Sequence, residues 1–138
     1  MKKRVVYVNG NFVDEDKAKV SVFDRGFLFA DAVYEVTAVI DGKILEWDGH
    51  VKRLERSLKE LDMKFPISET ELLDVHFDLI KKNTLKEGLI YLQVTRGEDD
   101  RSFDYPDESV KPTLVLFTQV KSLAESNLSL IHISEPTR

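Results

Sequence analysis

The sequence predicts an α+β domain: a mostly antiparallel sheet with two helices on one face. Three observations point to this class. Segments near both ends of the chain alternate apolar and polar residues with a period of two, glycine-containing pairs form tight turns, and the middle of the chain has helical spacing. With 138 residues the chain has the length of one ordinary domain, which we expect to occupy residues 1–126.

The first expected element is a hairpin. An Asn-Gly pair at 9–10 joins the strand-like residues 5–8 to 12–13, and Asn-Gly supplies the positive φ angles of a type I′ turn. Residues 18–23 then alternate apolar and polar side chains. They end at residues 24–26, where a glycine permits a sharp change of direction.

A second hairpin and the first helix follow. Residues 32–40 are rich in β-branched and aromatic side chains, and an Asp-Gly pair at 41–42 leads into a returning strand over 43–47. Apolar residues then recur at helical spacing, which predicts a helix over 48–62 with Asp48 as its N-cap.

Pro66 separates this helix from a second one. A capping box at residues 68–71 opens the second helix, which we expect to end near Asn83. Its apolar face includes His76, and a histidine in that position is more often a hydrogen-bonded core residue than a metal ligand.

The last part of the chain returns to strands. Residues 89–95 and 113–120 are strand-like, and residues 97–111 form a polar, proline-containing connection between them. Residues 127–138 have no clear period and closely resemble a translation of sequencing-adapter DNA. We therefore expect that they are not native, and they enter no functional argument.

Composition excludes several classes of function. The formal charge is −5 with basic and acidic residues interspersed, which argues against a nucleic-acid partner. No cysteine is present, so thiol redox chemistry and thiolate zinc sites are excluded. No apolar run approaches the roughly 20 residues of a membrane span, and no secretory signal is seen. We expect a cytoplasmic protein that acts on a small molecule.

Three places carry candidate functional residues. Tyr34 lies on an alternating strand, where its hydroxyl either faces a pocket or belongs to a half-buried core tyrosine. His50 and Arg53 share a helix face near its first turn, where an arginine grips a phosphate or is simply solvated. The long loop 95–106 is mixed in charge. Its acids lack the EF-hand pattern, so a solvated loop is favoured over a calcium site, and no metal site is expected.

Taken together and in order, these places resemble a known family. The stretch 24–36, the pattern His50-x-x-Arg53-Leu54 and the stretch 91–97 are similar to successive motifs of class IV aminotransferases. The similarity extends from about Val5 to Thr118 and is closest to the D-amino-acid transaminases. Branched-chain aminotransferases and aminodeoxychorismate lyases share the architecture.

The resemblance implies a cofactor and roles for individual residues. Arg53 corresponds to the arginine that binds the phosphate of pyridoxal 5′-phosphate, and His50 to a pocket histidine of the same motif. Tyr34 and Arg101 correspond to groups that hold the substrate carboxylate, with the Arg101 loop reaching a neighbouring subunit of a homodimer. Phe103 stands where D-amino-acid transaminases usually have a histidine, and phenylalanine donates no hydrogen bond.

The same resemblance implies that the Arg53 helix and the Tyr34 strand form half of one cup for coenzyme and substrate. It also implies that the Schiff-base lysine lies in a second domain that this chain lacks. We therefore expect the longer protein to transfer an amino group between an amino acid, such as D-alanine, and a 2-oxo acid. This fragment alone should be inactive, and the rival hypothesis is a non-catalytic binding or dimerisation module.

Overall fold

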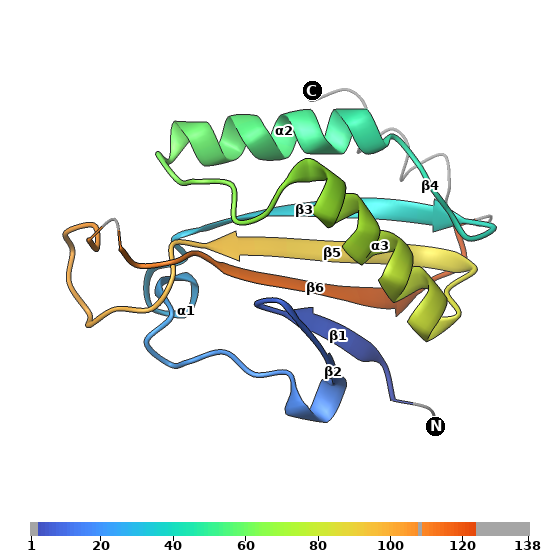
Figure 1. Cartoon of the computed structure of the whole chain (residues 1–138), viewed down its shortest axis with the longest axis horizontal. Helices are drawn as coiled ribbons and strands as arrows, with labels where there is room; N and C mark the ends of the chain where they lie inside the picture. The colour runs from blue at the N-terminus through green and yellow to red at the C-terminus, as the bar shows by residue number, and fades with distance from the viewer. Residues whose placement is uncertain (1–2, 108, 124–138) are drawn as a thin grey trace.

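The centre of the protein is a six-stranded sheet with the order β2-β1-β6-β5-β3-β4, in which every neighbouring pair is antiparallel. A computed structural model describes residues 3–107 and 109–123, and the elements named below are those of this part (Figure 1). The strands are β1 (Val5–Val8), β2 (Asn11–Asp14), β3 (Ala32–Ile40), β4 (Lys43–Ile44), β5 (Glu87–Thr95) and β6 (Thr113–Val120). The helices are α1 (Arg25–Phe29), α2 (Trp47–Glu60), α3 (Glu69–Asn83) and the 3-10 turn Glu15–Lys17.

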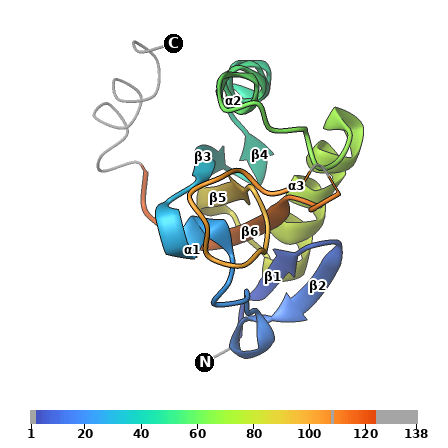
Figure 2. The same ribbon diagram turned by 90° about the vertical axis from the view of Figure 1, so that its left-hand side faces the viewer.

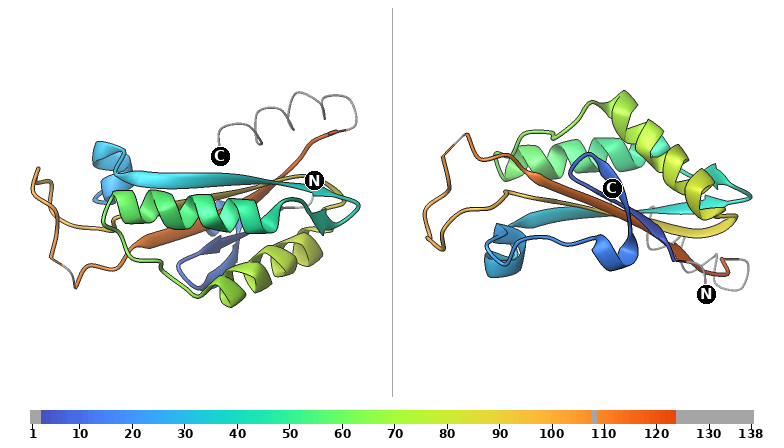
Figure 3. Two further views of the ribbon diagram at one scale, coloured as in Figure 1. Left: turned by 90° about the horizontal axis from the view of Figure 1, so that it is seen from above. Right: turned by 60° about the horizontal axis from the view of Figure 1, so that its bottom comes forward.

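Helices α2 and α3 cover one face of the sheet, whereas the short helix α1 lies toward the other side near one end (Figures 2 and 3). The predicted α+β class is therefore confirmed. Alternate residues of the central strands face the two helices and are fully buried, among them Val39, Ile90 and Leu116. Leu54 of α2 and Leu79 of α3 close the same core. Burial of these apolar side chains is the main driving force for this arrangement.

Both predicted hairpin turns are present. Asn9 and Gly10 have φ angles of 47° and 95°, and the flanking residues Val8 and Asn11 pair directly. At the second turn, residues 41–42 have φ angles of 53° and 70°. Two consecutive positive φ angles define the type I′ turn. The prediction that the Asn-Gly and Asp-Gly pairs supply these angles is therefore confirmed.

The stretch 18–23 forms no strand, although it alternates. Val20 and Val22 are 49% and 63% exposed, because the segment crosses the uncovered side of the sheet without a partner strand. The following Asp24 caps α1 by accepting a hydrogen bond from Gly26 N at 2.8 Å. Gly26 is needed for space rather than for a positive φ, since a Cβ there would lie 2.5 Å from Thr95 Cγ2. The predicted sharp turn is thus the start of a helix.

Helix α2 begins one residue earlier than predicted. Strand β4 ends at Ile44, so the returning strand is shorter than 43–47. Glu46 is the N-cap, with a φ of 56° and no side-chain cap, and Asp48 lies inside the first turn. The left-handed conformation of Glu46 turns the chain from β4 directly into the helix. For α3 the N-cap half of the predicted capping box is confirmed, since Ser68 Oγ accepts a hydrogen bond from Glu71 N at 3.1 Å. The Glu71 carboxylate accepts from Ser68 Oγ at 3.2 Å.

Candidate functional site

A buried cluster of three polar side chains joins β3 to α2. Glu35 accepts hydrogen bonds from Arg53 Nε at 3.2 Å and from Arg53 Nη2 at 2.9 Å. His50, one turn earlier in α2, places its Nδ1 2.8 Å from Glu35 Oε1. The side chains are 13%, 19% and 7% exposed for Glu35, Arg53 and His50. The predicted shared helix face of His50 and Arg53 is thus confirmed, and it is turned toward a carboxylate.

The electrostatics of this cluster depend on Glu35. Burial opposes ionisation of its carboxyl group, but hydrogen bonds from His50 and Arg53 and the charge of Arg53 outweigh burial and hold the pKa of Glu35 below its ordinary value. His50 Nδ1 also lies 2.7 Å from Arg53 Nη2. Arginine only donates and an ionised carboxylate only accepts, so Nδ1 bonds Glu35 when protonated and Arg53 when not. Glu35 therefore orients Arg53 directly, and it orients His50 when Nδ1 carries the hydrogen.

Tyr34 lies on the opposite face of β3 from Glu35, because successive residues of a strand point to opposite faces. Its side chain is 64% exposed and stacks on Tyr91 of β5, with ring centroids 5.7 Å apart. Tyr91 in turn stacks on Phe117 of β6 at 5.0 Å. Tyr34 is therefore the outer member of an aromatic row on the sheet face that the helices leave uncovered.

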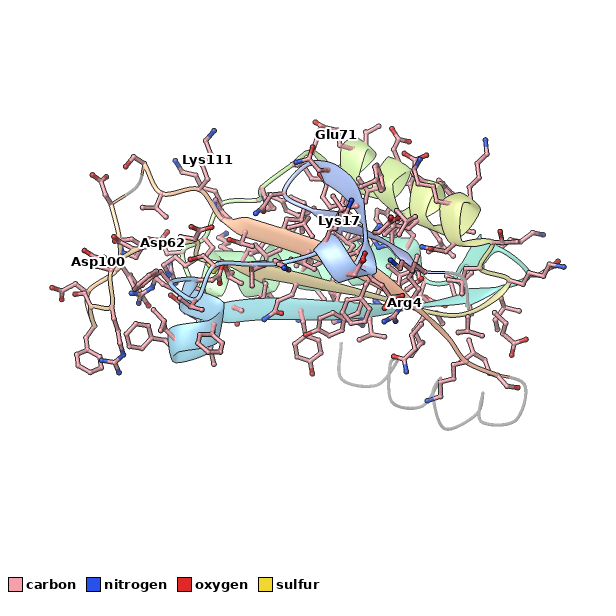
Figure 4. The ribbon with its side chains drawn as sticks, turned by 90° about the horizontal axis from the view of Figure 1, so that it is seen from below. Arg4, Lys17, Asp62, Glu71, Asp100 and Lys111 are labelled. Carbon is pink, nitrogen blue, oxygen red and sulfur yellow. The ribbon has the colours of Figure 1, made fainter. Side chains whose placement is uncertain are left out.

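Arg101 and Phe103 lie together on the loop between β5 and β6, at the end of the molecule that Asp100 marks in Figure 4. The guanidinium of Arg101 lies 4.9 Å from the ring centroid of Phe29 and 5.4 Å from that of Phe103. Phe103 is 83% exposed, and its ring centroid lies 5.7 Å from that of Phe29. Aromatic faces attract cations, so Arg101 lies between two favourable partners.

The structure brings the predicted residues together in two pairs rather than in one cup. His50 and Arg53 meet on Glu35, Arg101 meets Phe103, and Tyr34 lies apart from both pairs. The prediction that the Arg53 helix and the Tyr34 strand enclose one concavity is wrong for this chain by itself, because their side chains lie on opposite faces of the sheet. The two are nevertheless linked through β3, because Glu35, the partner of Arg53, is the residue next to Tyr34.

A pocket of about 370 Å³ lies on the uncovered face, between residues 18–27 and the sheet. Tyr91 and Phe117 line it with aromatic surface, and Gln93 and Thr95 supply polar groups. Its lining is therefore mixed, which is the usual character of a small-molecule site.

Sequence reasoning missed Glu35 and Asp31. Glu35 occupies an inward position of β3, between the buried Val33 and Thr37. An acidic residue at such a position predicts a buried cationic partner, because burying a carboxylate is costly unless a positive charge compensates it. Asp31 just before the strand accepts hydrogen bonds from Arg25 and Arg96, two arginines that are almost fully buried.

The part of the chain that the structure describes has neither a metal-binding cluster nor a membrane-spanning helix. Residues 3–107 and 109–123 contain no group of three or more His, Cys, Asp or Glu placed to hold a metal ion. No helix in this part of the chain is long and apolar enough to cross a bilayer. His76, which is 1% exposed, donates from Nδ1 to the Leu72 carbonyl at 2.8 Å, as expected for a core histidine.

Aminotransferases of two organisms match most of the chain. The D-alanine aminotransferase of Staphylococcus haemolyticus is 39% identical over 114 residues, which are 83% of this chain and 40% of that enzyme. A putative branched-chain-amino-acid aminotransferase of Methanocaldococcus jannaschii is 37% identical over 131 residues, 94% of this chain and 45% of that protein. The chain thus spans less than half the length of these relatives.

Solved structures share the fold. The branched-chain amino acid aminotransferase from Escherichia coli has a TM-score of 0.76 at 22% identity, covering 87% of this chain and 42% of that one. The 4-amino-4-deoxychorismate lyase from Pseudomonas aeruginosa has a TM-score of 0.68 at 26% identity, covering 86% and 41%. The model of the family described as amino-transferase class IV matches residues 32–138. With its fold, its ordered motifs and this match in agreement, the chain belongs to the class IV aminotransferases.

Proposed function

We propose that this chain is the N-terminal small domain, at residues 1–126, of a pyridoxal-phosphate-dependent enzyme that moves an amino group between an amino acid and a 2-oxo acid. The observation that carries this proposal is the identity of 36–39% with several staphylococcal D-alanine aminotransferases. The same observation supports a D-amino acid such as D-alanine as the donor. The remainder of the enzyme would follow this chain, because the relatives are more than twice as long.

The residues of this chain fit part of a site for the coenzyme. Pyridoxal phosphate, when bound, supplies the electron sink for proton removal at the α-carbon of the amino acid. Arg53 offers a part-buried guanidinium whose Nε and Nη2 are held by Glu35, and its permanent positive charge suits a phosphate. With His50 neutral, the cluster carries no net charge because Glu35 balances Arg53. Most of the charge that balances the phosphate must therefore come from outside this cluster.

Tyr34 and Arg101 would bind the substrate carboxylate. The exposed phenol of Tyr34 donates one hydrogen bond, and the exposed guanidinium of Arg101 provides the positive charge. Tyr34 lies on the sheet face that α2 and α3 leave uncovered, and Arg101 lies on an exposed part of the loop between β5 and β6. Phe103 adds no donor, so carboxylate binding would rest on these two groups and the apolar surface beside them.

The chain by itself should not catalyse transamination. Every lysine that the structure describes is solvent-exposed, and none has the desolvated surroundings that activate a Schiff-base lysine. We place that lysine in the part of the enzyme that follows this chain. Homodimer formation, with the Arg101 loop reaching the neighbouring subunit, and a cytoplasmic location belong to the same proposal.

The test uses the longer protein encoded by the source DNA, read in frame beyond residue 126. We expect the absorption band of its bound coenzyme to change when D-alanine is added and to return when a 2-oxo acid is added. A genuine stop codon at residue 127, or a longer protein whose coenzyme responds to no amino acid, would contradict the proposal and favour a non-catalytic binding or dimerisation module.

A matched pair of variants tests the role of Arg53. Arg53→Ala removes a charge-assisted phosphate contact, so coenzyme affinity should fall roughly 10- to 100-fold. Arg56→Ala is the control, because Arg56 is an exposed arginine of the same helix. Equal losses in both variants would show that Arg53 acts only through general charge.

Branched-chain transamination is the second candidate, favoured by the 37% identity with the putative branched-chain enzyme. A panel of D-alanine, L-leucine and L-valine separates the two reactions by which donor changes the coenzyme band. Lyase activity, the third family reaction, would appear as product formation that needs no 2-oxo acid acceptor.

A further inference from the structure

The loop between β5 and β6, residues 96–112, begins under tight backbone control. Gly97 O accepts a hydrogen bond from Arg25 N at 2.8 Å, and Asp99 N donates to Phe23 O at 3.2 Å. An antiparallel bridge pairs Asp24 with Glu98. Beyond Asp99 the residues up to 105 are exposed, so side chains have to hold the part of the loop that carries Arg101.

Asp31 is the centre of a buried arrangement that reaches this part, which we call the Asp31 clamp (Asp31, Arg25 and Arg96). Asp31 Oδ2 accepts from Arg25 Nε at 3.0 Å and from Arg96 Nε at 2.7 Å. The two arginines are 3% and 9% exposed. The backbone adds to this, because Asp31 N donates to Arg25 O and Asp31 O accepts from Arg96 N, each at 3.2 Å.

Each arginine extends from Asp31 to a different part of the molecule. Arg25 Nη1 donates to the carbonyl of Ser102, next to Arg101, at 2.8 Å. Arg96 Nη2 donates to the carbonyl of Leu61 at 2.7 Å, and the Arg96 guanidinium lies 3.9 Å from the ring centroid of Tyr105. The clamp therefore contacts the loop on both sides of Phe103 and ties it to the end of α2.

The clamp also bears on the side chain of Arg101. The guanidinium of Arg25 lies 4.7 Å from the ring centroid of Phe29, the ring that Arg101 contacts at 4.9 Å. Moving Arg25 would disturb both the Ser102 carbonyl and this ring. Without the carboxylate of Asp31, two buried guanidinium groups would face each other uncompensated, and such a charge cannot stay in place.

We propose that Asp31 is a positioning residue for Arg101: through Arg25 and Arg96 it fixes the loop so that the Arg101 guanidinium is held ready for a substrate carboxylate. The part concerning the substrate rests on the proposed transaminase function. The part concerning the loop is a property of this chain and is tested on it directly.

The experiment compares the 138-residue chain with Asp31→Asn by ¹⁵N relaxation and by the shift of the Arg101 Nε–H signal. Asparagine keeps the shape but loses the charge that holds two arginines. We expect backbone order parameters at residues 101–105 to fall from about 0.8 to below about 0.6, while those of β5 and β6 stay near 0.85. The Arg101 Nε–H signal should lose the shift that the Phe29 ring causes.

Asp41→Asn is the matched control, since Asp41 is exposed in a hairpin turn and asparagine tolerates its φ of 53°. It should leave the loop unchanged. If Asp31→Asn fails to fold, the variant Arg25→Lys tests the proposal instead. One ammonium group cannot reach both Asp31 and the Ser102 carbonyl, so the order parameters of the loop should fall while those of the sheet stay unchanged. An ordered loop and an unchanged Arg101 signal in the folded variant would overturn the proposal.

Failure of this inference is distinguishable from failure of the proposed function. In the longer protein, Asp31→Asn should raise KM for the 2-oxo acid about tenfold or more and change kcat less, because it disturbs binding of the carboxylate rather than proton transfer. A loosened loop in a protein without any transaminase activity would leave the clamp standing and overturn only the function.

Discussion

The two faces of the sheet use the same strands in opposite ways. On β5, Leu92 and Val94 face the helices and are 2% and 0% exposed, whereas their neighbours Tyr91 and Gln93 face the other side and are only partly buried. The helix-covered face is filled mainly by leucine and valine in one continuous cluster. The uncovered face has a row of stacked aromatic rings and an open pocket.

This difference separates the apolar core from the proposed carboxylate-binding residue along a single strand, β3. The side chains that hold the domain together point to α2 and α3, and Glu35 binds the candidate phosphate-binding Arg53 on the same side. The proposed carboxylate-binding residue Tyr34 lies on the other side, where its removal disturbs little packing. Three measurements test this separation, beginning with the largest expected effect.

The first measurement makes the same substitution on both faces of β5. Leu92→Ala should lower the free energy of unfolding by about 2–5 kcal/mol, because it opens a cavity in a closely packed core. Leu89→Ala, on the uncovered face, should cost less, roughly 1 kcal/mol, because Leu89 is partly exposed and its truncation opens no enclosed cavity. Urea unfolding of both variants measures the two values. Similar losses would mean that the uncovered face is also a core.

The second measurement uses the acid sensitivity of His76 on the helix-covered face. Burial lowers the pKa of His76 to about 4, against a smaller opposing effect of its hydrogen bond to the Leu72 carbonyl. Between pH 6.5 and 4 the unfolded chain binds a proton that the folded chain refuses, so stability falls as the pH falls, by roughly 3 kcal/mol in total.

His76→Leu should flatten this dependence when the free energy of unfolding is measured from pH 7 to 4.5. Phe77→Leu changes the next residue, which is 48% exposed, and should keep the wild-type slope. The pKa values of Asp31 and Glu35 are also lowered, so these carboxylates too lose stabilising energy on acidification. That loss occurs at a pH below the ordinary pKa of a carboxyl group. If the free energy of unfolding of His76→Leu kept the wild-type pH dependence, His76 would take up its proton equally well in the folded and the unfolded chain.

The third and smallest effect concerns Tyr34. Tyr34→Ala removes one stacking contact from an exposed row, so the free energy of unfolding should fall by no more than about 1 kcal/mol. In the longer protein the same variant should raise KM for the amino acid. A stability loss above 2 kcal/mol in the isolated chain would show that another surface covers this face, for example a second copy of the chain.

The sequence predicted most of the elements, and the errors have a common cause. The Asn-Gly and Asp-Gly turns and the N-cap at Ser68 depend on neighbouring residues only, and each was found. Residues 18–23 have the alternation of a strand but no partner, and a strand requires a partner for its hydrogen bonds. The start of α2 was missed because Glu46 adopts a left-handed conformation that its residue type does not favour.

The candidate site was predictable in its residues but not in its geometry. The spacing of His50 and Arg53 placed them on one helix face, which the structure confirms, whereas their shared partner Glu35 comes from a strand 15 and 18 residues away. The prediction of one cup with Tyr34 was wrong because adjacent strand residues point to opposite faces, so Glu35 and Tyr34 face different sides. The roles of the individual residues stay predictions.

By itself the sequence determined the α+β class, the hairpin turns, the helix that carries His50 and Arg53, and, through its ordered motifs, the family. These features follow from periodicity and local backbone preference, which act over a few residues. Only the tertiary structure decided that Glu35 binds Arg53, that Asp31 joins two buried arginines and that Tyr34 faces away from the helices. The reason is that a buried charge is stable only beside a partner, and the fold decides which distant residue that partner is.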